Sequence, residues 1–142
     1  MIYTLDTNVV VDALRQPAEL EALKAFLSWA LPSMVLSSIV AAELMAGARS
    51  DKSRRLLEDG VLAAFERRGR VVAPSAGTWR RAGALLARTA GSGLSASRQN
   101  DTLLAVQARE HGWLLITRDA DFAALRSHVT GLRIGAPYPR RG

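Results

Sequence analysis

The sequence predicts a single α/β domain in which a mostly parallel sheet of four to five strands is flanked by helices on both faces. Short apolar runs alternate with stretches of helical period along the whole chain. The length of 142 residues suits one domain, and a hydrophobic fraction of 49% is enough to build a core. We expect the domain to occupy residues 1–135 and residues 136–142 to form a loose tail.

The first half of the chain is expected to begin with a buried strand and then to be mainly helical. Asn8 is a candidate cap for the first helix, and Gly60 weakens the last one. Apolar runs and helical spacing predict strands at 2–6 and 34–37 and helices at 8–15, 18–31, 39–48 and 51–68.

The second half repeats the alternation of strand and helix. Gly112 is expected to end the helix at 100–111, and a Gly/Ser-rich loop is expected at 91–97. The remaining elements are strands at 70–73, 113–117 and 132–134 and helices at 78–89, 100–111 and 121–127. In parallel sheets of this kind, ligands bind beyond the carboxyl ends of the strands.

Residue usage excludes several classes of site. The chain has no cysteine, so disulfide scaffolds, zinc fingers and thiol nucleophiles are excluded. His111 and His128 are the only histidines, and neither the HExxH pattern nor a phosphate-binding GxxxxGK[ST] loop occurs. A haloacid-dehalogenase-like phosphatase needs a second Asp where Asn8 stands and a late lysine, but no lysine follows Lys52.

The chain is strongly basic, with a formal net charge of +6 and a pI near 11.0. Such charge favours polyanionic partners, above all nucleic acid, and arginine pairs well with phosphate. A high genomic GC content would also enrich arginine and leaves a second explanation open. The arginines cluster at 54–55, 67–70, 80–81 and 140–141.

No targeting or membrane segment is expected. The chain opens with MIYTLDTN, which lacks a basic segment before its apolar run. The least charged stretch, 30–48, contains Pro32, three serines and Glu43, which argues against a membrane span. We expect a cytoplasmic protein.

Acidic residues stand where a buried apolar environment is predicted. Asp6 ends the first strand, and Asp119 and Asp121 follow the fourth, so parallel strands would bring them to one edge. Glu43 and Asp101 each lie on the apolar face of a helix. Burying a lone carboxylate costs several kcal/mol unless charges or hydrogen bonds compensate. Such a cluster favours a divalent cation, and Mg²⁺ or Mn²⁺ prefers oxygen ligands and can activate water beside a phosphate.

Each acid also has a purely structural interpretation. Asp6 could cap the following helix, and Asp119 and Asp121 could belong to a plain turn and helix start. Glu43 could snorkel toward solvent or pair with a core arginine, and the helix dipole could account for Asp101 near a helix N-terminus.

Four motifs resemble those of PIN domains, and of the VapC-type toxins in particular. The chain shows them in the family's order and spacing, and the resemblance spans residues 2–135. They are LDTNVVVD at 5–12, SSIVAAEL at 37–44, NDTLLAVQA at 100–108 and LITRDADF at 115–122.

The resemblance implies a Mg²⁺- or Mn²⁺-dependent endoribonuclease for single-stranded RNA, the toxin of a type II toxin–antitoxin pair. Asp6, Glu43, Asp101 and Asp119 would be the catalytic and metal-binding acids, with Asp121 a second candidate beside Asp119. It also implies assistance from Thr7, Asn8 and Thr117.

The same resemblance implies a homodimer and a small VapB-like antitoxin whose C-terminal segment blocks the acidic site. A basic RNA-binding module without catalytic turnover remains the alternative. The loop at 91–97 and the basic helix around 51–70 are the places where we would look for RNA selectivity.

Overall fold

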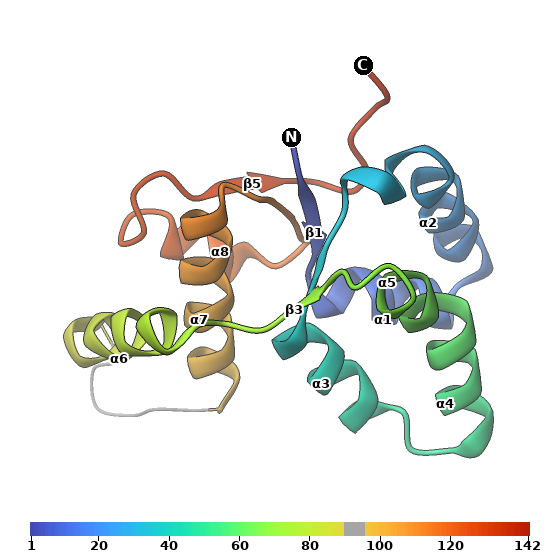
Figure 1. The fold of residues 1–142 in the computed structure, drawn as a ribbon, viewed down its shortest axis with the longest axis horizontal. Helices are drawn as coiled ribbons and strands as arrows, with labels where there is room; N and C mark the ends of the chain where they lie inside the picture. Colours follow the sequence, from blue (N-terminus) through green and yellow to red (C-terminus); the bar gives the residue numbers. More distant parts are fainter. Residues whose placement is uncertain (90–95) are drawn as a thin grey trace.

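Two small parallel sheets lie between two groups of helices in the computed structural model, which describes residues 1–89 and 96–142 (Figure 1). The larger sheet has the order β1–β4–β5 and consists of Tyr3–Leu5, Leu114–Ile116 and Arg133–Gly135. The smaller pairs β2 (Leu36–Ser37) with β3 (Val71–Val72).

The prediction of one sheet with four to five strands is wrong, although the alternation of elements and the parallel pairing are confirmed. Among the described residues, only a single bridge between Tyr3 and Met34 connects the two sheets. β2 and β3 have two residues each, and the contact with β1 lies just before β2, where the Val35 N–H donates to the Tyr3 carbonyl at 3.0 Å.

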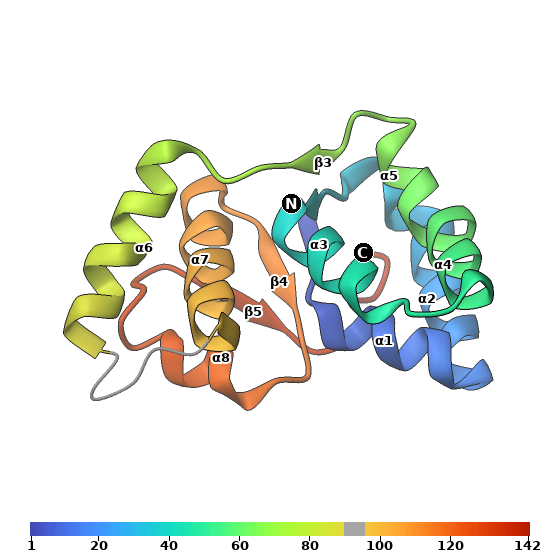
Figure 2. The same cartoon turned by 90° about the horizontal axis from the view of Figure 1, so that it is seen from below.

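Helices gather at both ends of the molecule, with the strands and α3 between them (Figures 1 and 2). One end holds α6 (Ala76–Thr89), α7 (Ala96–His111) and α8 (Ala120–Leu125). The remaining helices are α1 (Thr7–Arg15), α2 (Pro17–Ala30), α3 (Ser38–Gly47), α4 (Asp51–Leu57) and α5 (Ala63–Glu66). A 3-10 turn at Leu31–Ser33 follows α2, and a π-helical turn at Glu58–Leu62, which contains Gly60, joins α4 to α5.

Local sequence sets the ends of these helices. Asp6 caps α1, so the prediction that Asn8 is the cap is wrong by two residues. Ser37 caps α3, and Gly112 ends α7 with a φ of +69°, a conformation that glycine adopts without strain. The predicted loop 91–97 lies largely outside the described residues, and its last two positions belong to α7.

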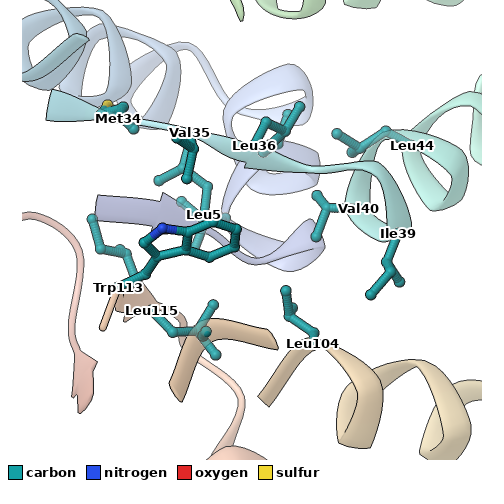
Figure 3. Packing of buried hydrophobic residues seen from close by; sticks show 14 of the residues in the cluster. Leu5, Met34, Val35, Leu36, Ile39, Val40, Leu44, Leu104, Trp113 and Leu115 are labelled. Carbon is teal, nitrogen blue, oxygen red and sulfur yellow. The ribbon is translucent and has the colours of Figure 1, made fainter. Parts of the chain in front are cut away.

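The hydrophobic core joins strands to helices from distant parts of the sequence (Figure 3). Leu5 of β1, Leu36 of β2 and Leu115 of β4 are completely buried, and Val40 of α3 and Leu104 of α7 pack against them. After β5, the chain returns to α2, where the ring of Tyr138 stacks on Phe26 with 5.2 Å between their centroids. Among the described residues, no helix is both long and apolar enough to cross a bilayer.

A buried glutamine ties α7 to the smaller sheet. Gln107 is fully buried; its Oε1 accepts a hydrogen bond from Ser37 Oγ at 2.6 Å, and its Nε2 donates to the Val72 carbonyl at 3.2 Å. Because Ser37 also caps α3, this side chain connects β2, β3, α3 and α7.

We expect Gln107→Ala to lower the free energy of unfolding by about 2–3 kcal/mol, because it leaves a cavity and removes the acceptor of the Ser37 hydroxyl and the donor to the Val72 carbonyl. Gln99, the other glutamine of α7, is only half-buried, and Gln99→Ala should change stability by less than about 0.5 kcal/mol. Urea unfolding followed by circular dichroism measures both. Equal effects would contradict the connecting role of Gln107.

Candidate metal centre

The register of β1 and β4 places Asp6 beside Thr117. Leu5 pairs with Ile116, and the Asp6 N–H donates to the Ile116 carbonyl at 3.0 Å. Thr117, the residue that follows β4, donates from its Oγ1 to Asp6 Oδ2 at 2.7 Å. Two residues that are 111 positions apart in sequence therefore meet at the carboxyl ends of neighbouring strands.

Asp6 is buried, with 5% of its surface exposed, and its side chain caps α1. Its Oδ1 accepts the Thr7 N–H at 2.8 Å. Burial raises the pKa of Asp6; the hydrogen bonds from Thr117 and Thr7 partly oppose this, and the charges of Glu43 and Asp119 add to it. The capping interpretation and the functional one are thus compatible.

The Thr117 hydroxyl bridges two acids. While it donates to Asp6, it accepts the Asp119 N–H at 3.0 Å. Asp119 in turn caps α8 by accepting the Asp121 N–H on Oδ1 at 2.9 Å. This chain of hydrogen bonds fixes the position of both late aspartates relative to Asp6.

Glu43 reaches the same region from α3. Thr7 Oγ1 donates to Glu43 Oε1 at 2.7 Å, and Asn100 Nδ2 donates to Oε2 at 3.5 Å. Glu43 therefore lies where α1, α3 and α7 converge, between Thr7 and the residue that precedes Asp101.

Asp101 occupies an unexpected place in its helix. The sequence predicts a helix start at Asn100, but α7 begins at Ala96, which makes Asp101 its sixth residue. The helix dipole acts mainly within the first turn and does not account for this acid. Burial, and then the charges of Asp6, Asp119, Glu43 and Asp121, raise the pKa of Asp101 to about 7.

Three carboxylates come close enough to share a cation. One oxygen from each of Asp101, Asp119 and Asp121 lies within 4.8 Å of the others. Asp6 and Glu43 lie outside this group, but their charges act on Asp101. These carboxylates are hard oxygen ligands whose negative charges repel one another. Such a set is suited to bind Mg²⁺ or Mn²⁺.

Ion pairing does not relieve this repulsion. Within residues 1–89 and 96–142, every ion pair between side chains involves other acids, namely Asp12, Glu19 and Glu110. The interpretation of Glu43 as the partner of an arginine is therefore wrong for the described part of the chain.

The sequence matches the PIN domain family over residues 3–127. The chain belongs to the PIN domain family. No curated protein matches it.

Solved structures share the fold over nearly their whole length. VapBC2 from Rickettsia felis, bound to a promoter DNA fragment, has a TM-score of 0.68 at 22% identity, covering 96% of this chain and 98% of that one. FitAcB from Neisseria gonorrhoeae has a TM-score of 0.66 at 27% identity, with the same coverage. DNA-bound VapBC from Salmonella typhimurium has a TM-score of 0.68 at 23% identity, covering 97% and 99%.

The residues expected to assist the acids of this PIN domain differ in their placement. Thr7 and Thr117 hydrogen-bond to the acids, whereas the Asn8 side chain accepts the Arg118 N–H at 3.5 Å. Sequence reasoning missed Asn100, although its polar side chain directly precedes Asp101 in the third motif.

Arg118 is a second residue that the sequence analysis missed. Its guanidinium binds Asp12 at 3.0 Å and Glu19 at 2.6 Å, which fastens the segment between Thr117 and Asp119 to α1 and α2.

The raised pKa of Asp101 predicts how stability depends on pH without metal. The folded protein holds this proton up to about pH 7, whereas the unfolded chain releases it near 3.8. Ionisation of Asp101 therefore lowers the stability of the PIN domain as pH rises between about 4 and 7. At pH 8, Asp101→Asn should be more stable than wild type by about 1 kcal/mol. This value already allows for solvent screening of the partly exposed carboxyl.

Thermal unfolding in chelator at pH 5 and pH 8 measures this difference. The exposed Asp59 on the π-helical turn provides the matched control, and Asp59→Asn should follow wild type at both pH values. If wild type instead gains stability relative to Asp101→Asn between pH 5 and pH 8, the claim that burial and neighbouring acids raise the pKa of Asp101 is contradicted.

Proposed function

We propose that this PIN domain is a divalent-metal-dependent endoribonuclease that hydrolyses phosphodiester bonds of single-stranded RNA. The observation that carries the proposal is the approach of Asp101, Asp119 and Asp121 to within 4.8 Å, with Asp6 and Glu43 beside them. A protein maintains such mutual repulsion at a cost to stability, and a bound cation offsets it.

In this proposal, Asp101 and Asp119 hold the metal, Asp121 supplies a further ligand, and Asp6 and Glu43 complete the negative environment. When bound, Mg²⁺ or Mn²⁺ neutralises charge on the phosphodiester and lowers the pKa of an attacking water.

The threonines set the geometry of these acids. Thr117 orients Asp6 and Asp119 together, and Thr7 orients Glu43. Since Asp101 keeps its proton up to about pH 7, metal binding at neutral pH releases a proton from this carboxyl.

An RNA-binding module without turnover is the weaker candidate. Arginines alone would provide affinity for RNA, and such a module has no need for five acids that share one edge of the fold. The observed cluster therefore favours a nuclease.

We further propose that the domain is the toxin of a VapBC-type pair and that a small VapB-like antitoxin covers its acidic site. The support is the shared fold with proteins solved as VapBC and FitAcB assemblies, together with family membership. A homodimer and a cytoplasmic location stay predictions from the sequence. The exposed Trp79 of α6 and Leu56 of α4 are large apolar side chains that partner chains could cover.

Cleavage of single-stranded RNA tests the enzymatic proposal. Wild type should cleave single-stranded RNA in the presence of Mg²⁺ or Mn²⁺ and be inactive in excess chelator. Asp101→Asn and Asp119→Asn should lose activity by about a hundredfold or more, because each removes a charged metal ligand. Asp59→Asn, the same chemical change at an exposed position, should retain full activity.

Mapping the products on total cellular RNA with wild type and Asp6→Asn would then identify the target. Cleavage that survives both chelator and the Asp101→Asn change would refute the metal centre. Tight RNA binding without metal-dependent turnover would instead support the binding-module alternative.

A further inference from the structure

Two pockets beside the acidic cluster have Arg88 and His128 in common. The first, about 600 Å³, begins at Asp101 and Asp121 and extends to these two residues. The second, about 670 Å³, continues from them to Arg109 on α7. Together they form a depression over α6, α7 and α8, here called the α6–α8 groove, which leads away from the candidate metal centre.

The groove is basic beyond its acidic end. The one acid that lines the second pocket, Glu110, is neutralised by two hydrogen bonds from Arg81, at 3.0 and 2.6 Å. Arg109 donates from Nε to the Thr130 carbonyl at 2.9 Å, which holds the guanidinium in place at the groove. Arg88 is exposed and has no ion pair or hydrogen bond from its side chain within the described part of the chain.

The floor of the groove is apolar and mostly buried. Leu125 of α8 is partly exposed in the first pocket, whereas Leu85, Val106 and Val129 beneath the second are buried. A single-stranded nucleic acid presents both phosphates and unstacked base faces, whereas a duplex presents mainly its phosphates. The exposed imidazole of His128, which lines both pockets, is a ring on which an unpaired base can stack, so the lining matches a single strand.

We propose that the α6–α8 groove binds the single-stranded RNA segment that flanks the scissile phosphate, with Arg88 and Arg109 on its phosphates. The inference rests on the proposed function, because the acidic cluster fixes where the scissile phosphate lies. Carboxylates repel the neighbouring phosphates, so a strand that enters the metal centre needs cations immediately beyond it.

The sequence suggests two places for RNA selectivity, the loop at 91–97 and the arginine-rich segment 51–70. Ser97, the last residue of that loop, lines the first pocket of the groove. The segment 51–70 instead folds into α4, α5 and the turn between them. These lie at the opposite end of the molecule from α6 and α7 in both views (Figures 1 and 2).

Binding measured without metal separates the groove from catalysis. The probe is a fluorescein-labelled octaribonucleotide of mixed sequence, in chelator, over a series of salt concentrations. Arg88→Gln should weaken binding about tenfold and reduce the salt slope of log K by about 0.7 for the lost phosphate contact. Arg80→Gln removes the same charge from an exposed position of α6 that lines neither pocket, and should change little.

Cleavage kinetics add a second readout. Arg88→Gln should raise KM for the octanucleotide much more than KM for a dinucleotide, because the dinucleotide has no flanking phosphate to lose. Arg88→Lys should recover much of the loss.

Equal weakening by Arg88→Gln and Arg80→Gln would overturn the proposal, as would a defect confined to duplex DNA. If wild type cleaves no RNA with either metal but Arg88→Gln still weakens RNA binding selectively, the groove is supported and the nuclease function fails.

Discussion

Repulsion among carboxylates at one edge of a parallel sheet is the constraint on which the site depends. The pairing of Leu5 with Ile116 brings Asp6 and Thr117 side by side, and the threonine hydroxyl then connects Asp6 to Asp119. Asp101 enters the same region from α7, where burial and four neighbouring acids hold its pKa near 7. Without a cation, this repulsion lowers the free energy of unfolding. A bound cation offsets the repulsion and thereby stabilises the folded protein.

Most of the architecture could be predicted from local pattern, and the same pattern singled out five acids whose role as a metal site stays a prediction. The alternation of strands and helices and the end of α7 at Gly112 follow from side-chain chemistry within a few residues. The cap of α1 does not, since it is Asp6 and not the predicted Asn8. The division into two sheets could not, because it depends on how short β2 and β3 become once they pack. The true start of α7 was missed because 96–100 is a polar stretch with no apolar period.

Contacts between side chains of different elements also could not be predicted from the sequence. Asn100 donates a hydrogen bond to Glu43, and Arg118 pairs with Asp12 and Glu19. These contacts join residues from different helices and loops, so the spacing of residues along the chain does not predict them. The same holds for the α6–α8 groove, whose arginines come from α6 and α7 and whose histidine follows α8. Net charge pointed to a polyanion, but only packing shows which arginines stand beside the acids.

Crystals grown with Mn²⁺ and measured for anomalous scattering test the central claim most directly. The account predicts a manganese peak at the acidic cluster, coordinated directly by carboxylate oxygens of Asp101 and Asp119, with the Thr117 bridge intact. A protein saturated with Mn²⁺ that shows no peak there, or one held only by residues outside the cluster, would contradict it.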